Sequence, residues 1–273
     1  MKKSLFAFVA VAFVALASTG MSGQAFAAGN TIDHIEAPEQ GWKHTGITGT
    51  FDRAAAQRGL QVYREVCASC HSLRHVAFRT LTGIGFTERE IKAIAAEYTV
   101  MADPNEEGDV LERNAQPFDY FPLVYANKQA AAASNNGAVP PDLSLMTKKR
   151  VGGENYVYSL LTHYREPTAE DLAILEKKNI SLGDTSYFNP IISGNQIAMA
   201  PPLIEDLVEY AAGQPKATLK QMAYDVSVFL TWTAEPKLED RKKLGFNVMI
   251  YLFIFCGIMF FAYRRIAKRI LGH

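Results

Sequence analysis

Cysteine is scarce in this 273-residue sequence, which contains only three. Cys67 and Cys70 stand close together, whereas Cys256 lies in a long apolar stretch near the C-terminal end. Once the first two are taken as a pair, no two cysteines remain for a structural disulfide. Net charge is also missing, because 28 lysines and arginines balance 28 aspartates and glutamates. The sequence therefore lacks the basic excess that is typical of proteins that bind nucleic acid.

The two neighbouring cysteines belong to a short motif. Cys67 and Cys70 stand three positions apart and His71 follows directly, which is the attachment signature of a c-type haem. Each thiol adds to one vinyl group of the porphyrin, so the sulfurs must lie about one helical turn apart. The imidazole that follows then lies beneath the iron as an axial ligand. A zinc site would need a further ligand pair, and a redox dithiol would follow a strand in a βαβ pattern. The motif therefore predicts one covalently bound haem c.

Residues 1–28 have the pattern of a cleaved signal peptide. Lys2 and Lys3 precede an apolar run at 5–17, and small residues follow at 25–28. The run is 13 residues long, shorter than the roughly 20 residues of a membrane span, and a small-residue cleavage site follows it. We therefore expect the chain after residue 28 to be exported.

Residues 244–263 form a different kind of apolar segment. These 20 residues carry no charge and are long enough to cross a bilayer as one helix. Basic residues lie on both sides, at 241–243 and in the tail 264–273, so charge bias alone does not orient the span. With an exported domain at 29–243, the span leaves the tail in the cytoplasm. Cys256 then packs inside the span as a small apolar residue.

The exported domain is acidic although the whole chain is neutral. Without Lys2, Lys3 and the four basic residues of the tail, 22 basic residues face 28 acidic ones, a net charge of −6. Such a domain suits a basic partner and disfavours nucleic acid. Acidic residues cluster within 106–112, and basic residues cluster at 148–150. By themselves, both clusters are typical of solvated surface.

Capping residues and apolar periodicity predict a mainly α fold. The expected helices span 52–66, 87–95, 154–164 and 218–236. The first of these helices ends in the cysteine motif. Residues 30–50 are predicted to form an extended arm with His34 and His44 as solvated loop histidines. The segment 101–122 is expected to be a loop, and 165–200 to be mostly irregular.

An electron-carrying haem also needs a second axial ligand. Met199 stands in a small-residue loop followed by two prolines, which restrict the backbone and can hold a weakly binding thioether in place. His163 is the rival and would give a haem with two histidine ligands. The spacing favours Met199 and leaves His163 as the alternative. Four other side chains fit less well: His75, Met101, Met146 and Met222.

Several segments in a fixed order resemble the cytochrome c1 family, the haem subunit of the cytochrome bc1 complex, in its bacterial form. They lie at 62–67, 103–108, 119–122, 135–138, 140–144, 150–157, 187–190 and 199–203, followed by one C-terminal anchor. The family implies a cytochrome c-like haem domain with long irregular insertions and one transmembrane helix. The chain departs from the family pattern at 191–194, where an aromatic residue and a proline usually precede the glycine.

The resemblance implies a role for each matching residue. Cys67 and Cys70 would bind the haem, His71 and Met199 would ligate the iron, Arg150 and Tyr156 would approach the propionates, and Pro140 and Pro141 would line the haem edge. The acidic residues Glu106, Glu107 and Asp109 become candidates for docking a basic cytochrome c. Some bacterial relatives carry an extra cysteine pair, which this chain lacks, so its Met199 loop must be stiffened by packing.

The resemblance also implies a function. The chain would carry one electron from the Rieske iron–sulfur protein to cytochrome c within a dimeric quinol–cytochrome c oxidoreductase that also contains cytochrome b. Its haem domain would lie in the periplasm and its anchor in the inner membrane. No residue acts as an acid, base or nucleophile on a substrate, so the chain alone is a relay. A haem subunit of a haem–copper oxidase is the alternative, but it does not predict the segments at 140–143 and 152–153. A haem peroxidase or gas sensor would need an open iron position.

Overall fold

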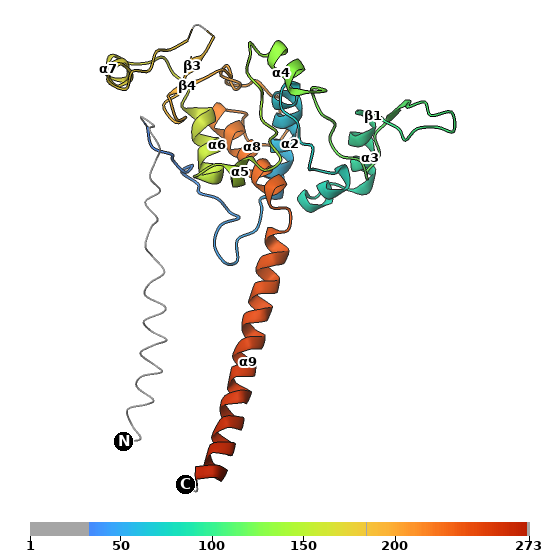
Figure 1. The fold of residues 1–273 in the computed structure, drawn as a ribbon, viewed down its shortest axis with the longest axis vertical. Coiled ribbons are helices and arrows are strands. Elements are labelled where there is room, and N and C mark those ends of the chain that lie inside the picture. The colour runs from blue at the N-terminus through green and yellow to red at the C-terminus, as the bar shows by residue number, and fades with distance from the viewer. Residues whose placement is uncertain (1–32, 184, 272–273) are drawn as a thin grey trace. The chain divides into compact units, whose positions relative to one another are not determined.

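A computed structural model describes residues 33–183 and 185–271, which belong to a single unit of the chain. The predicted signal peptide lies outside the described residues. The elements in chain order are α2 (Arg53–Glu65), η1 (Cys67–Ser69), η2 (Phe78–Ile84), α3 (Glu88–Ala96), β1 (Thr99–Met101), β2 (Glu112–Asn114), α4 (Lys128–Ser134), α5 (Met146–Lys149), α6 (Gly153–Thr162), α7 (Ala169–Lys177), β3 (Tyr187–Phe188), β4 (Gln196–Ile197), α8 (Leu219–Ala234) and α9 (Leu238–Leu271) (Figure 1). The mainly α prediction is confirmed.

Capping side chains start the helices where the sequence predicts them. Asp52 accepts a hydrogen bond from the backbone of Ala55 at the start of α2, and Thr218 does the same for Gln221 at the start of α8. Helix α3 begins with a full capping box between Thr87 and Glu90. The segment 165–200, expected to be mostly irregular, contains one further helix, α7.

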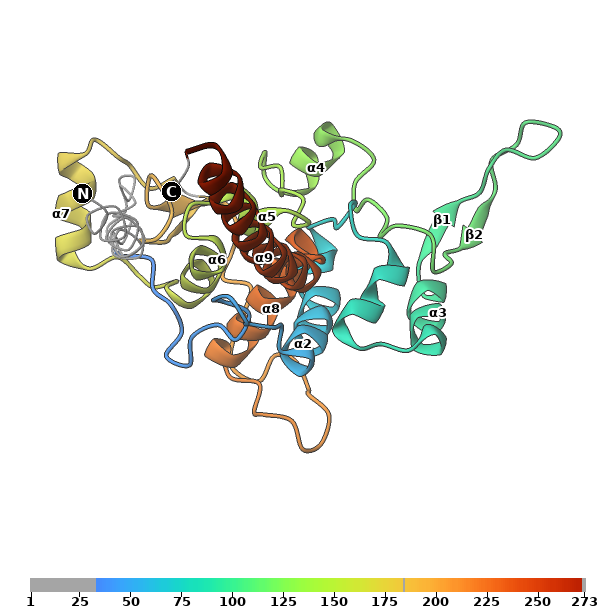
Figure 2. The ribbon, with the colours of Figure 1, turned by 90° about the horizontal axis from the view of Figure 1, so that it is seen from below.

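Helices α2, α6 and α8 lie side by side and enclose the core (Figure 2). Gly59 lets α2 approach α8 closely, because a Cβ atom at this position would lie 2.1 Å from the Asp225 carbonyl oxygen. The largest fully buried side chains include Trp232, Phe78, Phe229, Leu60 and Met222. Met222 is therefore part of the core, in agreement with its place on the apolar stripe of α8.

A buried ion pair joins α2 to α8. Asp225 is fully buried and accepts two hydrogen bonds from Arg58, at 2.9 and 2.8 Å. Tyr210 and Gln221 donate to the same carboxylate at 2.9 and 3.0 Å. Burial raises the pKa of Asp225 although these donors oppose the rise. The network therefore attaches the loop that carries Tyr210 to the core.

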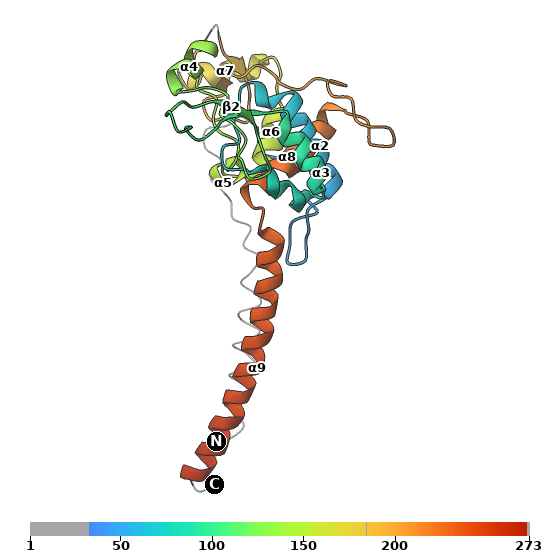
Figure 3. The same cartoon turned by 90° about the vertical axis from the view of Figure 1, so that its right-hand side faces the viewer.

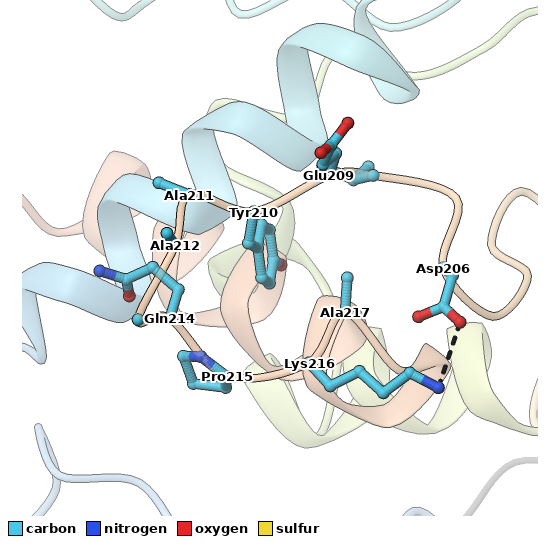
Figure 4. A pocket seen from close by; sticks show the side chains of 11 residues that line it. Asp206, Glu209, Tyr210, Ala211, Ala212, Gln214, Pro215, Lys216 and Ala217 are labelled. Carbon is cyan, nitrogen blue, oxygen red and sulfur yellow. Dashed lines mark ion pairs between the residues drawn. The ribbon is translucent and has the colours of Figure 1, made fainter.

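The loop around Tyr210 lines a pocket of its own (Figure 4). Asp206 donates its backbone N–H to the Ala217 carbonyl at 3.1 Å, and its carboxylate pairs with Lys216 at 3.1 Å. The lining residues lie between 206 and 217, and no predicted site residue is among them. The pocket is thus separate from the cysteine motif.

Two short antiparallel hairpins extend from the helices. In the first, Thr99 pairs with Asn114 and Met101 with Glu112, so the acidic segment 103–109 forms the hairpin end (Figure 2). In the second, Tyr187 pairs with Ile197. The first hairpin replaces part of the loop expected at 101–122.

His44 corrects the prediction of a solvated arm histidine. It is only 3% exposed, and its ring stacks on Phe51 with centroids 4.9 Å apart. Its Nε2 lies 3.4 Å from the Glu154 carboxylate. His34 is exposed, as expected. The arm is therefore packed against α6 and is not simply solvated.

Helix α9 is longer than the predicted span and begins four residues after α8 ends. Its apolar part is a candidate membrane span, with a mean hydropathy of 2.2 and none of it buried. Figure 3 shows it leaving the helical domain as one continuous helix. Glu239 near its start accepts hydrogen bonds from Arg53 at 2.6 and 2.8 Å, and Glu235 just before it pairs with Lys148 at 2.7 Å.

Candidate haem-binding site

The cysteine motif forms a tight turn at the end of α2. Val66 caps the helix, and the N–H groups of Cys70 and His71 both donate to the Cys67 carbonyl, at 3.1 and 2.9 Å. The two cysteines are therefore one turn apart, partly exposed and not joined in a disulfide. Burial of the thiol within its surroundings raises the pKa of Cys67 to about 12. This spacing fits two thioether bonds to one porphyrin.

The His71 ring is oriented by a backbone carbonyl. Its Nδ1 lies 2.8 Å from the Pro141 oxygen, and because a carbonyl only accepts, Nδ1 carries the proton. Nε2 is then left with a lone pair for a metal. Burial lowers the pKa of His71, and the Pro141 carbonyl opposes this only in part. The neutral imidazole that an iron ligand requires is therefore favoured.

The segment that carries Pro141 is attached to the residues after the motif. Leu143 donates its N–H to the Ser72 carbonyl at 3.0 Å. The Asp142 carboxylate accepts from the Arg74 N–H at 3.0 Å. These bonds hold the two segments side by side and fix the Pro141 carbonyl against His71. The family resemblance implied that Pro141 lines the haem edge. In the structure, its backbone carbonyl accepts a hydrogen bond from the His71 ring.

Tyr63 is a site residue that the sequence did not single out. Its hydroxyl donates to the His71 carbonyl at 2.8 Å, and burial raises the pKa of this tyrosine, so the hydroxyl stays protonated. Tyr63 stands within the segment 62–67, whose family resemblance was the available signal. Backbone and ring of His71 are therefore both restrained.

Met199 lies in a restrained loop on the chain that follows β4. It is partly buried, and its carbonyl accepts a hydrogen bond of 3.1 Å from the hydroxyl of Tyr164, just beyond α6. Burial raises the pKa of Tyr164, which keeps this donor protonated.

His163, the rival ligand, is engaged elsewhere. Its Nδ1 donates to the Ser159 carbonyl at 2.9 Å, and its Nε2 lies 3.9 Å from the carboxylate of Glu36 in the N-terminal arm. The His163 ring is therefore hydrogen-bonded to the last turn of α6 and faces the N-terminal arm.

Arg150 and Tyr156 lie together. The guanidinium of Arg150 stands 5.7 Å from the centre of the Tyr156 ring, and Tyr156 is 9% exposed whereas Arg150 is exposed. Gly152, with φ +90°, turns the chain between them. Over the described residues Arg150 forms no ion pair with a carboxylate, while the neighbouring Lys148 pairs with Glu235. The Arg150 guanidinium is thus available to an anionic group such as a haem propionate.

Glu106, Glu107 and Asp109 gather at the end of the β1–β2 hairpin, where all three are exposed. Asp109 donates its backbone N–H to the Asn105 side chain at 2.7 Å, and Gly108 adopts φ +87°. The carboxylates form no ion pairs with other described residues. They are available to a basic surface.

The donor set fits a haem: two unpaired thiols one turn apart, a neutral imidazole with a fixed tautomer, and an arginine that pairs with no carboxylate of the described residues. Together with the helical fold and the one candidate span among the described residues, this defines the class of helical domains with a haem-attachment motif and a long apolar helix. The chain belongs to the Cytochrome C1 family, whose model matches residues 42–270. The resemblance drawn from the sequence is thereby confirmed.

Relatives extend across plants, fungi and bacteria. The chain is 42% identical over 263 residues to "Cytochrome c1 1, heme protein, mitochondrial" of Arabidopsis thaliana, covering 94% of this chain and 82% of the relative. It is 47% identical over 219 residues to "Cytochrome c1, heme protein, mitochondrial" of Saccharomyces cerevisiae, covering 80% and 68%. It is 42% identical over 228 residues to "Cytochrome c1" of Rhodospirillum rubrum, covering 81% and 84%.

Proposed function

We propose that this chain is the electron-transfer subunit of a quinol–cytochrome c oxidoreductase, carrying one electron from the Rieske iron–sulfur protein to cytochrome c. The observation that carries the proposal is the hydrogen bond between His71 Nδ1 and the Pro141 carbonyl, which prepares Nε2 as an iron ligand. Family membership and the names of the relatives as heme proteins support it.

Each binding role falls on a residue that the sequence already singled out. Cys67 and Cys70 would hold one haem c covalently, and His71 and Met199 would be its axial ligands. Arg150 would neutralise the propionates with Tyr156 beside it, and Pro140 would line the haem edge next to Pro141. The haem would supply a one-electron carrier. If His71 and Met199 both ligate the iron, no open iron position would remain for a substrate, and the chain would act as a relay.

Met199 is the sixth ligand in this proposal. The prolines that follow it and the hydrogen bond from Tyr164 restrain its backbone, which favours a weakly binding thioether. His163 Nε2 faces the Glu36 carboxylate at 3.9 Å, so this ring would have to turn away from the N-terminal arm before its Nε2 could ligate an iron. A histidine and a methionine as ligands give a higher reduction potential than two histidines.

Partners and location follow from the charge pattern and from α9. Glu106, Glu107 and Asp109 would attract a basic cytochrome c, and cytochrome b would share the membrane with α9 in a dimeric complex. The haem domain would lie in the periplasm, α9 would cross the inner membrane, and the tail would lie in the cytoplasm. The predicted export signal and the long apolar helix support this orientation.

A redox-titrated optical spectrum of the membrane-bound chain tests the proposal. We expect the parent to contain a high-potential haem that does not bind carbon monoxide. Met199→Leu should lower the potential strongly and open the iron to carbon monoxide, because it removes the thioether and keeps the side-chain volume. Met101→Leu, at an exposed methionine of β1, is the matched control and should change neither property.

Two results would contradict the proposal. Carbon monoxide binding by the parent would indicate an open iron position and hence a peroxidase or gas sensor. A Met199→Leu variant with unchanged potential would exclude Met199 as the ligand, and His163→Leu would then be measured in the same way.

A further inference from the structure

A small loop beside the start of α9 has an unusual surface. Residues 45–48, called the Ile47 loop below, are exposed and carry no charge. Ile47 is 82% exposed, the highest value among the exposed large apolar side chains of the described residues. Removing an apolar side chain of this exposure from water is favourable, so a surface that covers Ile47 would lower the free energy.

Thr45, the first residue of the Ile47 loop, and Gly49, directly after the loop, lie close together and form a narrow neck. A Cβ atom on Gly49 would lie 1.9 Å from the Thr45 carbonyl oxygen, so the two sides of the neck touch and only glycine fits there. Gly46 adopts φ +74° at the turn. Below the neck, Trp42 stacks on Tyr224 with centroids 5.1 Å apart. Ile47 is therefore presented by a fixed base.

A lysine of α9 closes this neck. Lys242 donates from Nζ to the carbonyls of His44 at 2.6 Å and Gly49 at 2.9 Å, which lie on the two sides of the loop. Glu239, one turn earlier on α9, accepts from the Phe51 N–H at 2.8 Å. Figures 1 and 3 show the segment before α2 extending along the first turns of α9. The loop and the beginning of α9 thus form one structural unit.

The position of Lys242 along α9 indicates where the Ile47 loop lies relative to the proposed membrane span. Lys242 precedes the uncharged segment 244–263 by two residues, a rise of about 3 Å along a helix. In a helix that crosses a bilayer, lysines at this place lie at the headgroup level, and the apolar residues after them enter the hydrocarbon. The neck of the Ile47 loop, which Lys242 holds, therefore lies near the level at which the apolar segment of α9 begins.

We propose that the Ile47 loop inserts into the lipid headgroup region beside α9 and forms a second membrane contact of this chain. A single membrane helix leaves the orientation of the domain relative to the bilayer free, whereas a second membrane contact would fix that orientation. The inference rests on the proposed membrane span of α9 and is independent of how the haem is ligated.

Depth-dependent fluorescence quenching tests the contact. The full haem-loaded chain, with Cys256→Ala, receives Ile47→Cys and an environment-sensitive dye, and is placed in phosphatidylcholine vesicles. We expect quenching by lipids with a nitroxide near the headgroup and at least twofold protection from aqueous iodide, compared with a dye at Met101→Cys on the β1–β2 hairpin. A dye at Tyr251→Cys, inside the span, is the positive control. Each labelled variant must keep the haem absorption spectrum of its parent.

The results separate the failure of the contact from the failure of the span. A dye at 251 quenched by lipid, with a dye at 47 quenched only by iodide, places the loop in water and overturns the contact. No lipid quenching at 251 rejects the span itself and the contact with it. Protection of position 47 from both quenchers identifies a protein surface as the occupant, which also overturns the lipid contact.

Lys242→Met provides a second measurement. It removes the bond that closes the neck while keeping a long side chain on α9. We expect lipid quenching at position 47 to fall at least twofold, with quenching at 251 and the haem spectrum unchanged. Equal quenching at 47 with and without the lysine would contradict the role given to Lys242.

Discussion

At the residue scale, Tyr164 controls how firmly Met199 is held. Tyr164→Phe keeps the ring and removes the hydroxyl that bonds the Met199 carbonyl at 3.1 Å. One such bond contributes about 1 kcal/mol, so, with Met199 as the proposed iron ligand, we expect the population in which Met199 is detached from the iron to rise about fivefold. Carbon monoxide binding to the reduced protein measures this population. Tyr187→Phe, at an exposed tyrosine of β3, is the control. Binding equal to the parent would show that the hydroxyl does not restrain the loop.

At the same scale, His71 shows how much of a residue's role can be predicted from its neighbours in the sequence. His71 can be predicted as a ligand because the two thiols and the imidazole stand at a fixed short spacing, which is a local property. The carbonyl that sets its tautomer belongs to Pro141, 70 positions away. No spacing rule connects the two, since the contact depends on the backbone bonds between 72–74 and 142–143. The role of Tyr164 toward Met199 is hidden in the same way.

At the element scale, α7 depends on one carboxylate. Asp171 accepts hydrogen bonds from Thr168 and from Arg165, and the Arg165 bond contributes most to lowering the pKa of Asp171 to about 2. Because the unfolded chain takes up this proton at a higher pH, the stabilisation is complete above about pH 4 and is lost as the pH falls through about 2. Since Arg165 is one-third exposed, we expect a contribution of about 1–2 kcal/mol.

Hydrogen exchange of the amides at 169–177 measures this contribution after correction for intrinsic exchange. Asp171→Asn should accelerate exchange of α7 at pH 6, and the parent should approach the variant's protection near pH 2. Helix α3, whose capping box is intact, serves as the internal control and should be unchanged by the substitution. A variant whose α7 keeps its protection at pH 6 would show that the carboxylate does not stabilise the helix.

Helix prediction succeeded where a cap and an apolar stripe coincide, as in α2 and α8. It missed α7, although Thr168 and Asp171 have capping-box spacing, because the surrounding glycines, prolines and asparagines favoured an irregular segment. The prediction for His44 was wrong for a different reason. The residues directly before and after it, Lys43 and Thr45, are polar. Its burial comes from contacts with Phe51 and Glu154 and from the hydrogen bond that Lys242 donates to its carbonyl. Such burial is a tertiary property.

At the scale of the whole molecule, charge is divided between two ends of the unit. Near the start of α9, acidic and basic side chains pair with each other, as Arg53 does with Glu239 and Lys148 with Glu235. At the end of the β1–β2 hairpin the carboxylates have no ion-pair partners among the described residues. Composition could reveal the acidic excess, but only the fold separates the paired charges from the available ones. We therefore expect a long-range attraction for a basic partner to originate at the hairpin.

Neutralising the hairpin should slow the reaction with cytochrome c. We expect the triple variant Glu106→Gln, Glu107→Gln and Asp109→Asn to lower the second-order rate constant at low ionic strength by about tenfold, because electrostatic steering is lost. The difference should disappear at high salt, where screening removes the attraction from the parent as well. Stopped-flow oxidation of the reduced chain measures it. A control that neutralises three exposed glutamates around α7, Glu166, Glu170 and Glu176, changes the net charge equally. If both triple variants slow the reaction alike, net charge attracts the partner and the hairpin has no special role.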